Sequence, residues 1–510
     1  MRASSPQSLS GIELYIAAIL LAIANFVVVL DMTVANVSVS HIAGGLAISL
    51  NEGTYVITSY AVAEAIIVPL TGWLAGRFGE VRVFISCIIL FGICSLICGL
   101  SYTLDMLVIG RILQGLVGGP LMPMTQTLLM KIFPKDKQGA AIGLWSMTTL
   151  VAPVMGPIVG GYICDNWAWE YIFFINIPIT AFCGFFAIKL LTRFESTTHR
   201  LKIDYVGMIL LMIWVAALQF MLDEGKKLDW FESTEICLLA LVAFVGLISF
   251  LIWEFTQEHP IVDLRVFRHR GYTSSVLIIS VTFGAFFGSI VLTPLWLQNF
   301  MGYTATLSGF TTAAMGTLAI FVAPIVANLA QKYDPRALVF FGICVLATMT
   351  LVRAFNTTDM EMMQLYFQIL IQGVGLPFFF VPLTTLALAS VDHNELAAAA
   401  GFFNFSRTLA GAVATSIVTT AWDDYATIFR TDLVGRIATP QQIQALMAQA
   451  NQHIDVKSAT YILDGILENQ AIMLSTNHIF MMSACAFIFS AIIVWMAPRP
   501  THAVSPAMGH

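Results

Sequence analysis

Fourteen stretches of the chain are long and apolar enough to cross a lipid bilayer, and this feature restricts the fold more than any other. A bilayer core of about 30 Å requires roughly 20 apolar residues in a helix. The apolar residues run continuously instead of alternating, which excludes the strands of a membrane barrel. The stretches lie at about 13–35, 53–75, 82–101, 104–128, 139–163, 171–191, 205–222, 234–254, 273–299, 307–330, 337–355, 364–390, 396–421 and 477–497. The sequence therefore predicts an all-α integral membrane protein with 14 transmembrane helices.

The composition excludes a water-soluble enzyme. Hydrophobic residues make up 58% of the 510 residues and charged residues only 11%, whereas soluble domains contain about 25% charged residues. The net charge of −6 argues against a nucleic-acid partner. The eight cysteines are scattered through apolar stretches without a CxxC pair, so we expect neither a disulfide framework nor a metal site.

Lysine and arginine indicate the orientation of the chain in the membrane. The first stretch is too long for a secretory signal peptide and has no small-residue cleavage site, so we expect it to remain as a helix. With the N-terminus in the cytoplasm, 16 of the 24 basic residues fall in inner segments and six in outer ones, Arg353 among the latter. Cytoplasmic loops carry the excess of positive charge, so we expect both termini to be cytoplasmic.

Two basic connections divide the chain into six, two and six spans. They lie at about 192–204 and 255–272 and bracket the seventh and eighth spans. We expect a six-helix bundle over 1–203, a two-helix insertion with its linker over 204–270, and a second six-helix bundle over 271–510. Two halves around a central site suit an alternating-access transporter.

The segment 422–476 is predicted to form a long loop on the outer side. Residues 439–442 (TPQQ) have the pattern of a capping box with proline at the first helical position. Apolar residues then follow at helical spacing, first at Ile443, Leu446, Met447 and Ala450, and again at Ala459, Ile462, Leu463 and Ile466. The loop is either a lid packed on the outer rim of the protein or a docking surface for a periplasmic partner.

The chain lacks the phosphate-binding loop of an ATP-driven pump. Gly225-Lys226-Lys227 has neither the upstream glycine nor the hydroxyl residue of GxxxxGK[ST]. We therefore expect an ion gradient to drive transport, without a bound cofactor.

Four ionisable residues within the spans are the candidates for coupling to that gradient. Each such residue costs about 2.5–3.5 kcal/mol on insertion scales, so each is a functional candidate. Asp31 and Arg111 are both predicted roughly 8–10 Å below the outer membrane edge, from the 1.5 Å rise of a helix, and can pair if their helices are neighbours. Glu64 and Arg407 are predicted close to the midplane.

The roles of these four residues remain open at the level of the sequence. A low-dielectric environment favours the neutral form of a carboxyl group, and a neighbouring arginine opposes this effect. Asp31 either couples to protons or forms a structural pair or cap, with Arg111 as the partner that tunes a carboxyl. Glu64 either couples to protons, contacts a cationic substrate, or is a satisfied polar group. Arg407 either holds an anionic substrate group or bridges helices.

Two further groups are predicted from their positions in the spans. Side chains expected to line a substrate cavity with Arg407 are Gln126, Trp145, Gln298 and Asn404. The fifth span contains prolines and glycines that kink a helix and allow another backbone to approach. We expect these residues, Pro153, Gly156, Pro157, Gly160 and Gly161, to gate or seal the cavity.

Several motifs, in order along nearly the whole chain, resemble the major facilitator superfamily. More narrowly they resemble its fourteen-helix drug:proton antiporters and the EmrB-type multidrug efflux subunits. The matching segments are 30–37 (LDMTVANV), 72–79 (GWLAGRFG) with Arg82, 111–115 (RILQG), 156–161 (GPIVGG), 222–225 (LDEG) with 229–231 (DWF), and 404–411 (NFSRTLAG).

The resemblance implies a proton-coupled antiporter in the bacterial inner membrane that exports hydrophobic compounds. It also implies work with a periplasmic adaptor (a membrane fusion protein) and an outer-membrane channel. Asp31 and Arg111 match the residue types at the centre of the first- and fourth-helix motifs. Gly72, Arg77, Gly79 and Arg82 match the conformational latch between the second and third helices.

The chain departs from the family pattern at two positions. Gly76 occupies the place of a common aspartate, so the usual acidic partner of Arg77 is missing from the latch. Ser40 occupies the place of a proline at the end of the first-helix motif, which leaves the exit of that helix less fixed.

Three other functions compete with multidrug export. The first is dedicated export of one physiological substrate such as a fatty acid or a siderophore. The second is a membrane enzyme acting on lipid, which would need clustered nucleophile and base residues, whereas His41 and His393 are isolated. The third is a sensor or scaffold, against which the charges at the midplane argue.

Overall fold

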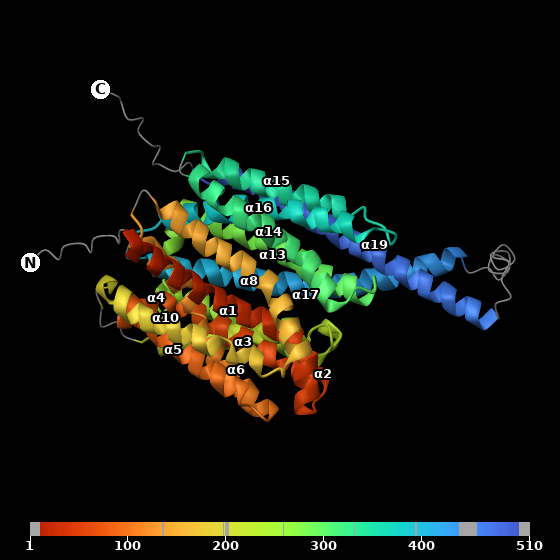
Figure 1. Cartoon of the computed structure of the whole chain (residues 1–510), viewed down its shortest axis with the longest axis horizontal. Helices are drawn as coiled ribbons and strands as arrows, with labels where there is room; N and C mark the ends of the chain where they lie inside the picture. Colours follow the sequence, from red (N-terminus) through yellow and green to blue (C-terminus); the bar gives the residue numbers. More distant parts are fainter. Residues whose placement is uncertain are drawn as a thin grey trace, which may run out of the picture.

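The structure is a computed structural model that describes residues 11–134, 137–196, 198, 203–258, 260–330, 332–392, 395–437 and 456–498. In these residues all regular secondary structure is helical, as the continuous apolar stretches predict. Figure 1 shows a bundle of long helices in which α1 begins, and α19 ends, at the same end of the molecule. We refer to this end as the terminal end and to the opposite one as the distal end.

Helices fill the three parts into which the sequence is divided, and the division into six, two and six spans stays a prediction. The N-terminal spans are α1 (Gly11–Leu46), α3 (Tyr55–Ile67) continued by η1 (Val68–Leu70) and α4 (Thr71–Phe78), α5 (Glu80–Gly99), α6 (Leu104–Gly118) continued by α7 (Leu121–Ile132), α8 (Gln138–Asn166), and α9 (Tyr171–Phe174) continued by α10 (Asn176–Leu191) and η3 (Thr192–Phe194). The insertion contains α11 (Tyr205–Glu224), η4 (Trp230–Glu232), α12 (Thr234–Thr256) and η5 (Leu264–Arg268). The C-terminal spans are α13 (Arg270–Asn299), α14 (Ala305–Leu329), α15 (Pro335–Arg353), α16 (Met362–Ala389), α17 (Leu396–Ile437) and α19 (Val456–Ile493) with η6 (Val494–Met496), and the short helix α2 (Leu50–Gly53) follows α1.

The number of spans agrees approximately with the predicted fourteen. Twelve helical segments of the described chain are long and apolar enough to cross a membrane, and α8 becomes a thirteenth when its two parts count as one span. Helix α17 is less apolar because polar side chains interrupt its sequence, yet it packs along α13 and α19 inside the C-terminal half. Its position makes it the fourteenth.

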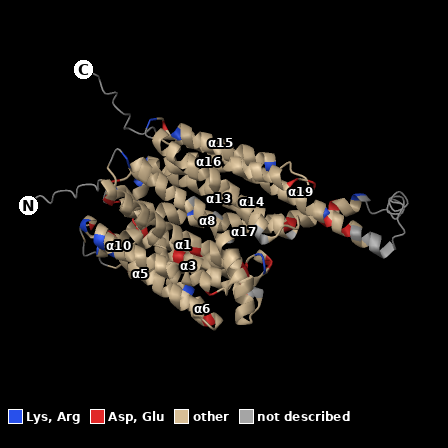
Figure 2. Cartoon of the chain, in the orientation of Figure 1, with Lys and Arg blue, Asp and Glu red and all other residues tan. Residues whose placement is uncertain are grey.

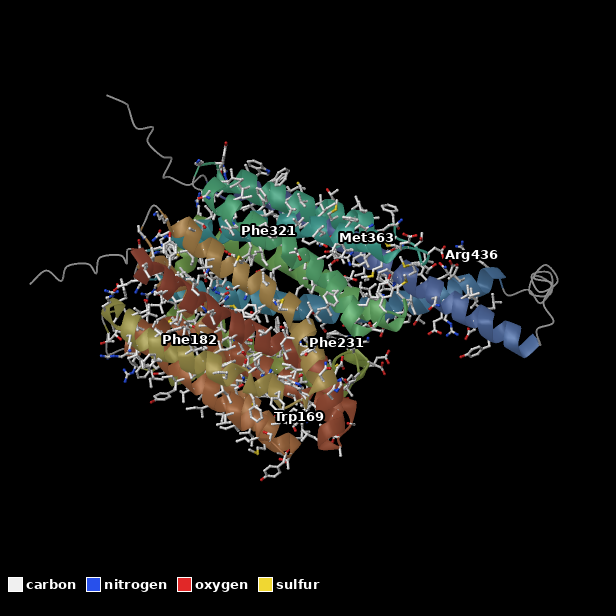
Figure 3. All side chains as sticks on the ribbon, viewed as in Figure 1. Trp169, Phe182, Phe231, Phe321, Met363 and Arg436 are labelled. Carbon is white, nitrogen blue, oxygen red and sulfur yellow. The ribbon has the colours of Figure 1, made fainter. Side chains whose placement is uncertain are left out.

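The outer surface of the bundle is apolar, as a lipid-facing surface must be. Phe182 on α10, Phe321 on α14 and Met363 on α16 are exposed large side chains among many others on the flanks of the helices (Figure 3). Lysine, arginine and the acidic residues gather toward the helix ends, and the middle of the bundle carries few of them (Figure 2). A contiguous apolar surface of this extent is not found on soluble monomers, which confirms the integral membrane class.

Local side chains fix where several helices begin. The first backbone amides of a helix lack partners within it, and a side-chain oxygen before the first turn accepts from them. Thr103 accepts from Met106 at the start of α6, Asp204 from Gly207 at the start of α11, and Thr304 from Leu307 at the start of α14. These caps set the boundaries at which apolar spans turn back into the membrane.

Glycines allow the same close helix crossing in both halves. A Cβ atom at Gly115 of α6 would lie 2.5 Å from the Tyr60 carbonyl oxygen of α3, and one at Gly373 of α16 would collide with the Met315 carbonyl oxygen of α14. The helix pair α3 and α6 therefore corresponds to the pair α14 and α16. This correspondence supports a repeat of two six-helix halves that the sequence shows only faintly.

The structure adds detail to two expectations about helix ends. Helix α1 continues through Ser40 to Leu46 because serine, unlike proline, keeps the backbone donor that an α-helix needs. The segment 422–476, expected as a loop, is helical as far as Ile437 and again from Val456. Both helices extend beyond the bundle at the distal end (Figure 1), since charged residues end an apolar stretch without ending a helix.

The detailed expectations for that segment are only partly within the described residues. The capping box at 439–442 and the stripe from Ile443 to Ala450 lie outside them, as do the side chains of Ala459 and Ile462. In the second stripe Leu463 is half-buried and Ile466 is exposed, whereas the neighbouring Leu467 is buried. The described part of this stripe thus has one buried side and one exposed side, and the lid and the docking surface both stay predictions.

We predict that the crossing at Gly373 is essential to the stability of the C-terminal half. The substitution Gly373→Ala forces α14 and α16 apart, and overpacking of this kind costs about 1–3 kcal/mol or more. We expect a lower thermal unfolding midpoint and less folded protein in detergent, measured by fluorescence and size-exclusion chromatography. Gly44→Ala is the matched control, because a Cβ there meets no atom within 4 Å. Equal midpoints for the two variants would contradict the crossing.

Candidate functional site

A buried ion pair joins the first and fourth spans. Arg111 Nη1 of α6 donates to Asp31 Oδ2 of α1 over 2.6 Å. The other carboxylate oxygen, Oδ1, accepts from Asn176 Nδ2 at 2.6 Å and from Gln114 Nε2 at 3.1 Å. Ser95 Oγ in turn accepts from Asn176 at 3.0 Å and from Gln114 at 3.4 Å. Side chains from α1, α5, α6 and α10 thus form one polar network around Asp31.

The remaining groups around Arg111 enclose the pair and shield it from solvent. Its Nε donates to the Val56 carbonyl oxygen at 3.1 Å, and its guanidinium lies 4.3 Å from the Tyr60 ring centre and 5.6 Å from that of Phe173. Each charged side chain of the pair is only 1% exposed. A pair of this kind can release or shift its charge only when the helices that enclose it move.

Glu64 is a second buried carboxyl, on α3. It is 2% exposed, and its Oε2 has no hydrogen-bond partner among the described residues. Burial and the charges of Arg407, Arg111 and Asp31 set its electrostatic environment. Buried polar atoms without a partner are rare in folded proteins and require an explanation. Glu64 therefore lies within electrostatic reach of both the Asp31–Arg111 pair and Arg407.

A polar cluster lies where the N-terminal half meets the C-terminal half. Asn404 Nδ2 of α17 donates to Gln126 Oε1 of α7 at 3.0 Å. Arg407, one turn further along α17, donates to the Met122 sulfur of α7. Within the described chain, Gln126 Nε2, Asn404 Oδ1 and Arg407 Nε have no hydrogen-bond partner. These three atoms retain bonding capacity for a ligand or for water.

Aromatic rings surround the guanidinium of Arg407. Its central carbon lies 5.1 Å from the Phe283 ring centre, 5.7 Å from that of Phe380 and 6.0 Å from that of Trp145. Trp145 of α8 stacks on Phe380 of α16 with ring centres 5.7 Å apart. An arginine among aromatic rings gains cation–π attraction, and the same rings present apolar surface beside a positive charge.

The structure brings four of the five predicted cavity residues together and leaves one apart. Gln126, Trp145, Asn404 and Arg407 meet at the interface of the halves. Gln298 lies exposed in the last turn of α13, at the distal end. The apolar stretch predicts that Gln298 lies in a span, but it does not show how far this end of the helix lies from the centre of the protein.

The proline- and glycine-containing motif bends α8 against α1. The parts Gln138–Pro153 and Ile158–Asn166 meet at 42°. A Cβ at Gly156 would collide with Thr33, and one at Gly160 would lie 3.1 Å from Val34 Cγ1, whereas Gly161 faces open space. Pro153 is half-buried, and the side chain of Pro157 lies outside the described residues. The bend and the two close glycines bring the backbones of α1 and α8 into contact.

The predicted latch region touches the other half of the protein. A Cβ at Gly72 of α4 would lie 2.7 Å from the Ala398 Cα of α17, so the halves meet there at backbone distance. Gly79, between α4 and α5, has φ = 95°, which glycine adopts without strain. Arg77 lies 5.9 Å from the Phe78 ring centre. These contacts close the terminal end between α4 and α17.

Glu195, an acidic residue that was not expected from the sequence, binds the start of α5 next to the latch. The Glu195 carboxylate accepts from the backbone amides of Val81 at 3.1 Å and Arg82 at 3.0 Å, and lies 3.7 Å from Arg82 Nε. Ser196 Oγ accepts from the Glu80 amide. The connection after η3 thus caps α5 and supplies an acidic group next to the latch. Glu195 lies far from Gly76 in the sequence, so no local pattern indicates that it lies near the latch in the fold.

Other important residues were also missed from the sequence. Ser95, Gln114 and Asn176 are polar residues within apolar spans, and this signal was available. Arg353, expected outside the membrane, is 2% exposed, donates to Thr293 and Gln372, and lies 4.1 Å from the Phe480 ring centre. Its place at the end of an apolar stretch concealed its burial.

A group of metal-ligand residue types at the terminal end forms an ion-pair cluster. His269, Asp392 and Glu395 have ligand atoms within 4.8 Å of one another. Arg268 donates to Glu395 at 2.8 Å and to Asp392 at 3.3 Å, and His269 lies 3.0 Å from Glu395. Because a guanidinium already balances these carboxylates, the cluster ties the linker before α13 to the start of α17.

We predict that Asp31 and Arg111 depend on each other for stability. Removing one partner of a buried ion pair costs about 3–5 kcal/mol because the other charge remains buried and unpaired. Asp31→Ala and Arg111→Leu should each strongly lower the thermal unfolding midpoint in detergent. The double variant should lose clearly less than the sum of the two single losses, and strict additivity would contradict the pair.

The chain matches a known family over most of its length. A model of the Major Facilitator Superfamily matches residues 21–415. The chain is 42% identical over 495 residues to Multidrug export protein EmrB of Escherichia coli (strain K12), covering 96% of this chain and 97% of the relative. It is 40% identical over 498 residues to Fatty acid resistance protein FarB of Neisseria gonorrhoeae, covering 97% and 98% of the two chains.

Solved structures agree on the fold. The human organic anion transporter MFSD10 (TETRAN) superposes with a TM-score of 0.61 at 11% sequence identity, over 95% of this chain and 100% of that one. At this identity the likeness shows the fold alone. Together with the family match and the relatives, it shows that the chain belongs to the major facilitator superfamily and is a secondary transporter, not an enzyme.

Proposed function

We propose that this protein is a proton-coupled antiporter that exports hydrophobic compounds from the cytoplasm or the inner leaflet. The observation that carries the proposal is the pair of buried carboxyls, Asp31 and Glu64, each under the influence of a buried arginine. The names of the relatives, which include a multidrug export protein, support export as the direction of transport.

The proposed orientation places the terminal end in the bacterial cytoplasm and the protein in the inner membrane. Basic residues at that end support it, among them Arg77, Arg82, Lys131, Arg193 and Arg265, by the excess of positive charge in cytoplasmic loops. In this orientation Gly72 and Ala398 meet on the cytoplasmic side. The conformation is then one in which the cytoplasmic path is closed.

Proton coupling is proposed to work through exchange of partners around the two carboxyls. Asp31 is fully hydrogen-bonded in this conformation, whereas one oxygen of Glu64 has no partner among the described residues. Movement of α6 away from α1 would separate the Asp31 carboxylate from the arginine that balances its charge, and a buried charge without a partner is costly. The bent contact between α1 and α8 is the proposed gate.

The substrate is proposed to bind at the cluster of Gln126, Asn404 and Arg407. The rings of Trp145, Phe283 and Phe380 offer apolar contact there, and the unpaired polar atoms offer a few directional bonds. Ligand sites commonly combine an apolar wall with a small number of polar groups. An apolar wall without fixed hydrogen-bond geometry suits chemically diverse hydrophobic substrates.

A narrower substrate range is the second candidate. Export of fatty acids is favoured by Arg407, whose positive charge among aromatic rings suits a carboxylate on an apolar chain, and by the relative named for fatty acid resistance. Growth assays against unrelated toxic compounds and against long-chain fatty acids separate the two. Protection against fatty acids alone would favour the narrower function.

The distal extension of α17 and α19 is the proposed docking site for a periplasmic adaptor, which would connect to an outer-membrane channel. Exposed apolar residues lie on it, namely Ile428, Val434, Tyr461 and Ile466. Arg430 of α17 donates to Asp464 of α19 at 2.7 Å and holds the two helices together.

We expect Asp31→Asn to abolish proton-coupled export while substrate affinity stays within a few-fold of the wild type. The asparagine side chain keeps one acceptor oxygen in place of the two of the carboxylate, and it cannot bind or release a proton. The measurement is substrate-triggered proton flux in proteoliposomes, with Glu64→Gln tested in parallel. Asp105→Asn, at an exposed carboxyl in the first turn of α6, is the matched control and should retain flux. Full flux in both Asp31→Asn and Glu64→Gln would refute the coupling proposal.

We expect negative charges introduced on the distal extension to reduce export in cells without affecting transport by the isolated protein. Tyr461→Glu combined with Ile466→Glu should reduce drug resistance in cells that contain the adaptor and leave proton flux in proteoliposomes unchanged. Asn469→Glu, at an exposed polar position on the same helix, is the control. Unchanged resistance in the double variant would exclude this surface as the docking site.

A further inference from the structure

A cavity of about 620 Å³ lies between the two-helix insertion and the C-terminal half. Its volume falls in the range of sites that hold small ligands. It is separate from the cluster of Gln126, Asn404 and Arg407, although α13 and α17 border both. Side chains from α11, α12, α13 and α17 form its walls, including Trp214, Leu218, Phe250, Ala285, Phe405 and Leu409.

The cavity is almost entirely apolar. Ser280 and Ser406 are the hydroxyl residues in its wall, and Ser280 already donates to the Val276 carbonyl oxygen at 2.8 Å. Cavities lined by apolar side chains exclude water and accept apolar molecules. Its occupant is therefore a hydrocarbon group.

The cavity runs from the terminal end to beyond the depth of one leaflet of the bilayer. Val262 and Leu264, in the linker at the terminal end, form its floor. Along α17, which begins at Leu396, the wall residues Phe402 and Ile417 lie about 9 Å and about 32 Å from the helix start at 1.5 Å per residue. One leaflet supplies about 15 Å of hydrocarbon, half of the bilayer core.

In the described residues, hydrogen bonds and an ion pair join the region of α11 and η4 to the C-terminal half toward the distal end, and Arg268 of η5 binds Glu395 at the terminal end. The Leu222 carbonyl oxygen accepts from Ser416, Trp230 donates to Thr420 at 3.0 Å, and Lys226 lies 2.5 Å from Asp423. Nearer the terminal end, Trp214 of α11 and Phe405 of α17 meet with ring centres 6.0 Å apart, and the cavity lies beside this contact, among α11, α12, α13 and α17. An acyl chain in the cavity would fill the space among these four helices.

A basic residue stands beside the floor of the cavity. Arg265 follows Leu264, is exposed, and has no ion-pair partner among the residues described. The nearby charges are engaged, since Arg268 binds Glu395, Asp263 accepts from the Arg265 amide, and Asp204 accepts from Trp253. The guanidinium of Arg265 suits an anionic group at the membrane surface.

We propose that this cavity binds one acyl chain of an anionic phospholipid from the leaflet at the terminal end, with its headgroup phosphate on Arg265. The bound chain holds the insertion against the C-terminal half. The site is independent of proton coupling and of the substrate cluster, so failure of either proposed role leaves it unaffected.

Trp214 provides a direct test, because it lines the cavity and is only 4% exposed. Lipids in the surrounding bilayer cannot reach it, whereas a chain in the cavity contacts it. The protein is reconstituted in vesicles that contain phosphatidylglycerol with brominated acyl chains, which quench tryptophan on contact. The contribution of Trp214 among the 10 tryptophans is obtained by difference from Trp214→Phe.

We expect strong quenching of the Trp214 component and a several-fold loss of that quenching in Ala285→Phe and, separately, Leu218→Phe, which fill opposite walls. Leu241→Phe, on the exposed face of α12, is the matched control and should quench as the wild type does. Arg265→Gln should remove the preference for phosphatidylglycerol over phosphatidylethanolamine, and Lys332→Gln should not. The proposal would be overturned if the Trp214 component were not quenched, or if it were quenched in both cavity-filling variants as strongly as in the wild type. If free brominated fatty acid quenched Trp214 and brominated phospholipid did not, the ligand would be a free fatty acid and the phospholipid proposal would be wrong.

Discussion

The cost of placing charge and unpaired polar groups in a membrane governs this structure. Within the hydrocarbon region water is not available, so backbone groups are satisfied in helices and buried charges must find partners. Asp31 and Arg111 meet this demand together, with Gln114, Asn176 and Ser95 completing the bonds of the carboxylate. The network connects four spans of the N-terminal half, and the position of each span therefore depends on it.

The two halves stabilise their buried arginines in different ways. In the N-terminal half a carboxylate balances the buried arginine. In the C-terminal half Arg353 is held by Thr293, Gln372 and the ring of Phe480, and within the described residues no carboxylate forms an ion pair with it. Gln114 and Gln372 stand next to the corresponding glycines at the helix crossings, which supports a shared ancestry of the two halves. The proposed proton exchange therefore falls to the half that contains the carboxylate.

Close backbone contact explains how the halves can move as units. Lipid provides no hydrophobic force between helices, so packing through small residues holds them together. Gly72 against Ala398, and Gly143 against Ala327, join the halves at the terminal end without interlocking side chains. Such a contact can separate without breaking ion pairs. The insertion touches both halves, since α11 packs against α3 and α17, and so its attachment bears on their relative motion.

The sequence by itself determined the helical class, the approximate number of spans, the family and the identity of Asp31, Glu64, Arg111 and Arg407 as buried charges. These properties follow from composition and from local order along the chain, because a membrane requires long apolar helices and makes each intramembrane charge conspicuous. Only the tertiary structure decided that Glu195 serves the latch, that Arg353 is buried, that Gln298 stands apart, and that α17 and α19 extend beyond the bundle. The physical reason is that partners such as Glu195 and Arg82 are separated by more than a hundred residues. Their meeting depends on how whole helices pack, which no local pattern encodes.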